Sequence, residues 1–311
     1  MADIVLHHYD ISPYAEKIRA ILGYKGLAWR SVTIPRIMPK PDLVALTGGY
    51  RRTPVMQIGA DVYCDTALIV RVLEDAKPSP TLYPYGDTLA LDAMARWADG
   101  ALFNITVPLA FQGEGMKQFF PDASPAELEA FRNDRAAMRQ GGSVRRGPLA
   151  ECKANFAFLM PRLEAEFADG RAFLFGNSPC AADFSVYHPL WPIRSVAAFA
   201  EVLEPYPRAL QWIDRMIGIG HGKPKDLSSA QALEIAKSST PAGIGDPVAF
   251  ETEGIGLGET VEVMPVDYAL DPVRGELLTC SAEKIALKRR DTRAGTVVVH
   301  FPRFGFQLRR A

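Results

Sequence analysis

The chain has 311 residues, of which 48% are hydrophobic and 23% charged, a composition typical of a globular protein with two or three domains. Its formal net charge of -1 excludes a strong field that would gather nucleic acid or an anionic membrane, so we expect small-molecule partners. No stretch reaches the roughly 20 apolar residues of a membrane span, and the N-terminus lacks a secretory signal pattern. We therefore expect a soluble, cytoplasmic protein.

The chain opens with a predicted strand and helix. Residues 4–9 are rich in β-forming side chains, and from residue 13 apolar residues recur at helical spacing until Gly26, which suits a helix C-cap. Between the two lies Ser12-Pro13-Tyr14, in which Ser12 is a good N-cap and proline suits the first helical position. A simple cap is the plain interpretation of Ser12, and a hydroxyl that serves a bound ligand is the alternative.

The following elements complete an N-terminal α/β domain. The predicted elements are strands at 29–34, 55–58 and 62–64 and a short helix at 42–46. Asp65-Thr66 then opens another helix. The order βαβ and then ββα predicts a thioredoxin-like domain over residues 1–78. Thiol-disulfide enzymes of this fold carry two cysteines where this chain has Ser12 and Ala15, so the site cannot cycle a disulfide.

A proline-rich stretch at 78–84 separates this domain from an all-α domain predicted over residues 87–222. Helical periodicity covers residues 89–102, 125–140, 149–167, 181–190 and 207–216. The fourth of these helices follows Cys180-Ala181-Ala182-Asp183, which has the form of a capping box with cysteine in place of Ser or Thr. Either Ser178 caps this helix instead, or its start is weaker.

A β-rich tail follows a second boundary near residues 241–245. Short runs of β-forming residues at 261–263, 277–279, 285–287 and 297–299 alternate with turn residues. These runs predict a small β domain over residues 247–311, either a barrel or a rolled sheet. We therefore expect three domains in the whole chain: an α/β domain, then an all-α domain, then a β domain. The tail has nine basic and nine acidic residues, so it has no net charge that would attract the phosphates of a nucleic acid. We expect the tail to have a structural or dimer-shaping role.

Two short motifs add binding capacity to the N-terminal domain. In Thr53-Pro54-Val55, the residue before a cis-proline can present its backbone N–H and C=O to an extended peptide, although an ordinary strand-start proline is the alternative. At Asp65-Thr66, the free N–H groups of the helix can bind a carboxylate and Asp65 can accept from an amine, unless the two residues only cap the helix.

Metal and disulfide chemistry are not indicated. The four cysteines, Cys64, Cys152, Cys180 and Cys280, lie far apart and form no CxxC pair, which is typical of a protein in a reducing compartment. His7 and His8 have no partner at ligand spacing, so we expect no metal.

On these motifs, residues 4–218 resemble the glutathione S-transferase superfamily with a serine-type active site. The resemblance implies glutathione as co-substrate and a homodimer. The resemblance implies that Arg52 binds the glycyl end of glutathione, and that Thr53, Pro54 and Val55 bind its cysteinyl backbone. It implies that Asp65 and Thr66 bind the γ-glutamyl end. Ordinary members of the superfamily end soon after the helical domain, so the resemblance says nothing about residues 247–311.

The resemblance also implies the catalytic residue. Helix N-termini and nearby donors lower a thiol pKa from about 8.5 to about 3.5 to 7.5, so Ser12 is the expected hydroxyl donor to a glutathione thiolate. Tyr9 is the rival donor, because tyrosine-type members place theirs near the end of the first strand. A pocket for a small hydrophobic electrophile is expected between the first two domains near Tyr14, Phe103 and Phe111, with Trp97 close by, although plain core is the favoured interpretation of each aromatic.

The predicted function is a glutathione transferase that activates the thiolate for attack on a small electrophile, as in detoxification. One alternative is a glutathione-dependent isomerase or lyase. Another is a non-catalytic glutathione- or ligand-binding protein whose tail mediates an interaction. The sequence separates these three poorly, because all of them need the same glutathione site.

Overall fold

The computed structural model describes residues 3–311 and confirms the thioredoxin-like N-terminal domain. Its elements are β1 (Ile4–His8), α1 (Pro13–Tyr24), β2 (Ala28–Thr33), α2 (Pro41–Thr47), β3 (Val55–Ile58), β4 (Asp61–Cys64) and α3 (Thr66–Ala76). β1 pairs with β2 in parallel and with β3 antiparallel, and β3 pairs antiparallel with β4. Every residue of β1 is buried, as expected for a strand with a neighbour on each side and helices packed on the sheet.

The second domain is helical, as predicted. Its elements are α4 (Leu89–Trp97), η1 (Ala98–Leu102), α5 (Phe103–Ala110), α6 (Gly113–Phe119), α7 (Pro125–Ala137), α8 (Leu149–Glu166), α9 (Ala181–Ser195), η2 (Ala197–Phe199), α10 (Ala200–Leu203) and α11 (Pro207–Gly218). The helix expected to end near residue 102 instead continues through η1, a five-residue π-helical turn, into α5. The short α6 was not predicted.

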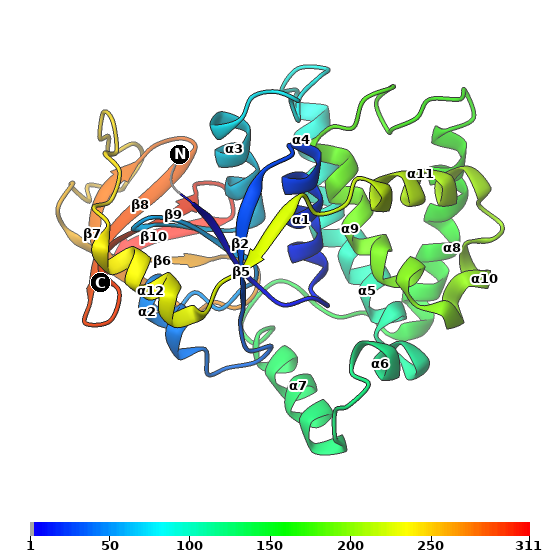
Figure 1. The fold of residues 1–311 in the computed structure, drawn as a ribbon, viewed down its shortest axis with the longest axis horizontal. Coiled ribbons are helices and arrows are strands. Elements are labelled where there is room, and N and C mark those ends of the chain that lie inside the picture. The colour runs from blue at the N-terminus through cyan, green and yellow to red at the C-terminus, as the bar shows by residue number, and fades with distance from the viewer. Residues whose placement is uncertain (1–2) are drawn as a thin grey trace.

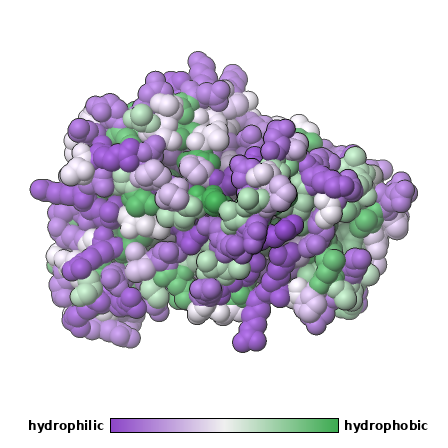
Figure 2. All heavy atoms as spheres, turned by 90° about the horizontal axis from the view of Figure 1, so that it is seen from below, coloured by the Kyte–Doolittle hydropathy of each residue, from purple (hydrophilic) through white to green (hydrophobic). Residues whose placement is uncertain are grey.

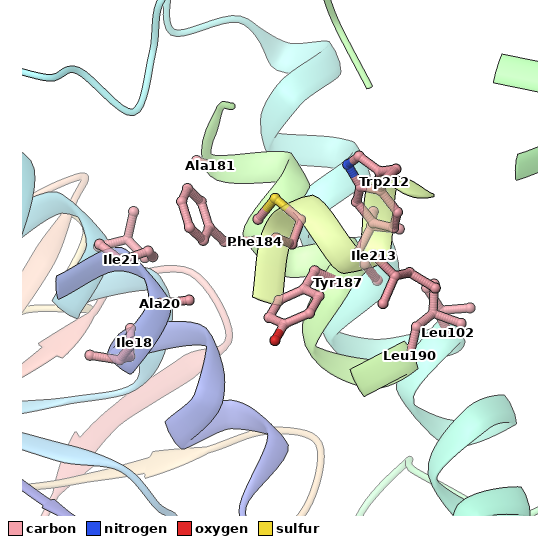
Figure 3. Packing of buried hydrophobic residues seen from close by; sticks show 14 of the residues in the cluster. Ile18, Ala20, Ile21, Leu102, Ala181, Phe184, Tyr187, Leu190, Trp212 and Ile213 are labelled. Carbon is pink, nitrogen blue, oxygen red and sulfur yellow. The ribbon is translucent and has the colours of Figure 1, made fainter. Parts of the chain in front are cut away.

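The first two domains share one hydrophobic core (Figure 3). Ala20 of α1 points toward Phe184 and Tyr187 of α9, whereas Ile18 and Ile21 lie on the side of α1 away from α9, and Trp212 of α11 lies beyond Phe184 and Tyr187. These side chains are fully buried, so the two domains form a single packed unit that fixes the position of α1.

Asp183 resolves how α9 begins. Its carboxylate accepts hydrogen bonds from the backbone N–H of Cys180, at 2.9 Å, and from that of Leu174, also at 2.9 Å. It accepts a third from the indole N–H of Trp212 at 2.9 Å. The N-cap is therefore Cys180 and not Ser178, and the buried acid ties the helix start to α11.

Two further segments extend the sheet. β5 (Lys223–Asp226) pairs in parallel with β2 and is followed by α12 (Ser229–Ser238). The tail contributes β6 (Thr260–Pro265), β7 (Val273–Cys280), β8 (Lys284–Asp291), β9 (Gly295–Pro302) and β10 (Phe306–Arg310). The sequence did not predict β5, because its four exposed residues include two lysines, a proline and an aspartate.

The tail is β-rich, as predicted, but a separate barrel is not confirmed. β9 pairs in parallel with β4, so that all ten strands form one sheet in the order β10-β6-β7-β8-β9-β4-β3-β1-β2-β5 (Figure 1). β10 pairs with β6, and among the described residues it has no second strand neighbour that would close a barrel. Phe301 of β9, Phe306 of β10 and Tyr50 pack together in a core shared by the tail and the N-terminal domain.

A buried polar pair joins the tail to β4. The imidazole Nε2 of His300 lies 2.7 Å from a carboxylate oxygen of Asp61, whose other oxygen accepts the backbone N–H of Ala242 at 2.7 Å. Tyr63 stacks on the His300 ring with 4.7 Å between ring centroids. The junction is thus specified by side chains as well as by strand hydrogen bonds.

The surface view in Figure 2 shows hydrophilic side chains over most of one face, with apolar residues in small groups between them. Among residues 3–311, no helix combines the length and apolar character needed to cross a membrane.

Candidate functional site

Two adjoining cavities lie where the N-terminal domain, the helical domain and the tail meet. The first has a volume of about 210 Å³ and is lined by Tyr9 and Ser12, and the second, of about 200 Å³, is lined by Asp65 and Thr66. The residues that line both are Tyr14, Arg52, Thr53, Asp99, Gly100, Asp267 and Tyr268. The two cavities therefore share a wall and bring together residues from all three parts of the chain.

Ser12 lies at the start of α1, at the edge of the first cavity. Its hydroxyl oxygen accepts the backbone N–H of Ala15 at 3.2 Å, so it caps the helix, and Pro13 occupies the first turn. Only 4% of Ser12 is exposed. Its hydroxyl proton has no acceptor among the described residues, so the cap leaves that proton available to a ligand.

Tyr9 lines the same cavity. Its hydroxyl oxygen accepts a hydrogen bond of 3.1 Å from Arg135 of α7, and the Lys40 ammonium lies 5.7 Å from its ring centroid. Tyr9 and Ser12 thus both reach the cavity, but only the tyrosine oxygen is held by a cationic side chain.

The segment before β3 contributes through its backbone and a threonine. The Thr53–Pro54 peptide bond is cis. Thr53 lines both cavities, and its hydroxyl oxygen accepts from the Lys40 ammonium at 3.2 Å. Pro54 lines the second cavity, whereas the Val55 side chain is fully buried and lines neither. Any role of Val55 in binding would therefore belong to its backbone.

Asp65 and Thr66 begin α3 at the second cavity. The Asp65 carboxylate accepts a hydrogen bond from the backbone N–H of Ala67 at 2.9 Å. The backbone of Asp65 has a φ of 78°, a conformation that L-residues rarely adopt. Burial raises the pKa of Asp65 above its ordinary value, although the positive charge of Arg52 and the Ala67 N–H oppose the shift. Both the capping interpretation and a ligand-binding one fit this geometry.

Arg52 is held by the tail, which the sequence did not predict. Its guanidinium donates to the Asp267 carboxylate and to the Tyr268 carbonyl oxygen. It also lies over the Tyr268 ring, 3.8 Å from the centroid, and 3.9 Å from the Asp65 carboxylate. A side chain that the family resemblance assigned to the glycyl end of glutathione is thus already bound to a carboxylate of its own chain.

The segment that carries Asp267 is also joined to the helical domain. The Asp267 carbonyl oxygen accepts the backbone N–H of Val144 at 3.2 Å, and the Ala269 N–H donates to the Met138 carbonyl oxygen at 2.6 Å. A Cβ at Gly142 would lie 1.9 Å from the Asp267 carbonyl oxygen, so the close approach requires glycine there. The connection between β6 and β7 therefore forms a third wall of the site.

Asp99 is a functional candidate that the sequence analysis missed. It belongs to the π-helical turn η1 and lines both cavities. Its carboxylate accepts from the buried Lys17 ammonium at 2.8 Å and lies 2.9 Å from His188 Nε2. Burial by itself would raise the pKa of Asp99, but Lys17 and His188 lower it below its ordinary value. The only sequence signal was an Asp-Gly pair inside a predicted helix.

The predicted aromatic residues meet at the first cavity. Tyr14, Phe103 and Phe111 all line it, and the Tyr14 ring packs against Phe103 with centroids 4.6 Å apart. The Tyr14 hydroxyl donates to the Asp99 carbonyl oxygen. Trp97 is 39% exposed and lines neither cavity. The first cavity thus combines an aromatic lining with the polar groups of Ser12 and Tyr9.

Comparison with protein families gives two matches. The family model described as glutathione S-transferase, N-terminal domain, matches residues 6–81, and that described as glutathione S-transferase, C-terminal domain, matches residues 149–215. A comparison with curated protein sequences found no significant match.

Solved structures extend the likeness over the whole chain. A GST-like protein from Pseudomonas syringae is 44% identical, and the match covers 100% of both chains with a TM-score of 0.83. A glutathione S-transferase from Rhodospirillum rubrum F11 is 20% identical over 68% of this chain and 86% of its own, with a TM-score of 0.50. The Pseudomonas protein is therefore similar along the β tail as well, whereas the Rhodospirillum protein shares the fold of about two thirds of the chain.

Proposed function

Because this chain belongs to the glutathione S-transferase superfamily, we propose that it binds glutathione and directs the glutathione thiolate to a small electrophile. Glutathione lies across the wall shared by the two cavities. Its cysteinyl backbone pairs with the main chain at Thr53 and Val55, beside Pro54. Its γ-glutamyl end lies at Asp65 and Thr66, where helix N–H groups and a carboxylate complement the ligand's carboxylate and amine.

Ser12 holds the sulfur in its reactive form. The hydroxyl proton of Ser12 has no acceptor in the described chain and donates to the thiolate, while the N-terminus of α1 adds a favourable dipole. Both effects stabilise the anion and lower the pKa of the bound thiol below its free value of about 8.5. The thiol proton passes to solvent, and the sulfur lone pair then forms a C–S bond with the electrophile in the first cavity while the leaving group departs with the electrons of its broken bond to that carbon.

The observation that carries this proposal is the position of Ser12 relative to the binding motifs. Ser12, Thr53 and Tyr14 line one cavity, and Thr53 and Tyr14 line the next one together with Asp65 and Thr66. This shared lining supports a site in which Ser12 meets the sulfur while Asp65 and Thr66 meet the γ-glutamyl end. Arg52 offers its remaining N–H groups to a carboxylate of the tripeptide.

Two measurements test this function. Calorimetry with glutathione tests the site, and an absence of binding at millimolar ligand would contradict the proposal. Turnover with 1-chloro-2,4-dinitrobenzene tests catalysis. If glutathione binds but a broad electrophile panel gives no turnover, the chain is a glutathione-binding protein and not a transferase.

We also propose that the chain acts as a homodimer, as is usual in the superfamily. Sedimentation equilibrium at micromolar concentration should give twice the chain mass of 34.1 kDa. A measured mass equal to that of one chain would contradict the proposed dimer, but it would not bear on the proposed glutathione site.

A further inference from the structure

The first cavity has a pronounced excess of arginine. Three arginines of α7 and the connection after it, Arg135, Arg139 and Arg146, line it, as do Arg51 and Arg52 of the N-terminal domain. The same cavity has an extended apolar lining, to which Ile11, Val107, Pro108, Phe131, Met138 and Val144 contribute. A cavity that joins a large apolar surface to several cations is suited to a molecule that is both apolar and anionic.

Some of these arginines already have partners. Asp134 accepts from Arg51 at 2.5 Å and from Arg135 at 3.1 Å, and Asp267 accepts from Arg52. Arg135 additionally donates to the Tyr9 hydroxyl and packs 4.7 Å from the ring centroid of a neighbouring phenylalanine. These three cations are therefore part of the structural frame of the site.

Arg139 and Arg146 differ from the others. Over residues 3–311, neither guanidinium has a hydrogen-bond acceptor or an ion-pair partner, although Arg139 is half-buried. Burial lowers the pKa of Arg139, and the like charges of Arg146 and Arg135 lower it further. The two acids that line the cavity, Asp99 and Asp267, are each bound to another cation. The cavity therefore contains a local positive charge that the protein itself does not neutralise.

We propose that the electrophile carries a carboxylate on an apolar body, and that Arg139 and Arg146 bind this carboxylate; the inference rests on the proposed function. Guanidinium groups match a carboxylate with paired N–H donors, and a bound anion relieves the repulsion between the two arginines. The aromatic lining near Phe103 and Phe111 takes the apolar body. The small hydrophobic electrophile expected from the sequence is thereby specified as an organic acid.

A matched pair of electrophiles measures this preference. In 4-chloro-3,5-dinitrobenzoate and its amide, the same ring carbon accepts the glutathione sulfur. The C–S bond forms, the C–Cl bond breaks, chloride leaves with the bonding electrons, and the thiol proton passes to solvent. We expect kcat/KM of the wild type to be about tenfold higher for the acid after correction for the uncatalysed rates, and the ratio to fall with added salt.

Variants connect the preference to the two arginines. Arg139→Gln with Arg146→Gln should reduce the acid-to-amide ratio about tenfold, and the corresponding lysine substitutions should restore part of it. Arg145→Gln is the matched control, because Arg145 is exposed and does not line the cavity, and it should keep the wild-type ratio. A ratio near one in the wild type, or an unchanged ratio in the double glutamine variant, would overturn the inference.

A binding measurement keeps this inference separate from the proposed function. 3,5-dinitrobenzoate and 3,5-dinitrobenzamide lack the leaving group, so calorimetry measures their affinity without turnover. Tighter binding of the acid that is lost in the double glutamine variant supports the anion site even if no electrophile is turned over. Equal affinities of the two compounds contradict it even if chlorodinitrobenzene is a substrate.

Discussion

The guanidinium of Arg52 donates to the carboxylate of Asp267, which lies 215 residues later in the chain. This contact joins the N-terminal domain to the connection between β6 and β7, and it does so directly at the wall shared by the two cavities. The tail is therefore part of the site as well as part of the sheet.

A double-mutant cycle measures this contact. Arg52→Met and Asp267→Asn, alone and together, should give a coupling energy of about 1 kcal/mol in urea unfolding, because one partner is buried and the other is 39% exposed. The exposed pair Arg310 and Glu259, 3.5 Å apart, is the control and should couple by less than about 0.5 kcal/mol. Equal coupling in both pairs would mean that the Arg52 contact does not hold the tail.

Ser12→Ala should affect turnover and stability together. Loss of one preorganised donor lowers kcat about 100-fold, and loss of the cap on Ala15 costs about 1 kcal/mol of unfolding free energy. Ser12→Thr keeps the hydroxyl and should retain much of both. Tyr9→Phe should lower kcat less than tenfold, because in the proposed site Ser12 and not Tyr9 donates to the sulfur. If turnover survives in Ser12→Ala and is lost in Tyr9→Phe, the catalytic role belongs to Tyr9.

Lys40 should make stability depend on pH. Burial lowers the pKa of Lys40 to about 7, with Arg135 adding to the shift, whereas an unfolded lysine titrates near about 10.4. Between these values the unfolded chain binds more protons than the folded one, so folding becomes more favourable as pH rises.

Urea unfolding at pH 7 and pH 9 tests this prediction with Lys40→Met. The wild type should gain on the order of 2 kcal/mol relative to the variant between these pH values. A constant difference would mean that the Lys40 ammonium keeps its ordinary pKa in the fold.

Phe301 should be essential to the joined sheet. It is fully buried against Tyr50 of the N-terminal domain, so Phe301→Ala should cost about 3–5 kcal/mol. Phe304, three residues later, is 68% exposed and lies over Arg96, and Phe304→Ala should cost less than about 1 kcal/mol. Similar losses for the two variants in urea unfolding would contradict an essential role of Phe301 in the joined sheet.

Local features were predictable from the sequence. The start of α1 at Pro13 follows from cap and proline chemistry, which depends on a few adjacent residues. The two strands after Pro54 and the helix after Asp65 were predicted for the same reason. Hydrophobic periodicity then identified most of the helical domain.

Features that depend on distant partners were not predictable. Strand composition indicated a β-rich tail, but it does not say which existing edge the tail strands will pair with, so the junction between β4 and β9 was missed. β5 forms because β2 offers an open edge and not because Lys223 to Asp226 favour strands. Asp99 and Asp267 join the site only through tertiary packing, which leaves no local motif.

The parallel pairing of β4 with β9 has an implication for biosynthesis. During translation, β4 leaves the ribosome well over two hundred residues before β9, and until then its outer backbone N–H and C=O groups have no strand partner. Over that interval the nascent protein therefore has an unprotected edge that another polypeptide could pair with. Pairing with β9 ends that exposure, and chaperone dependence should be greatest while β4 has left the ribosome and β9 has not.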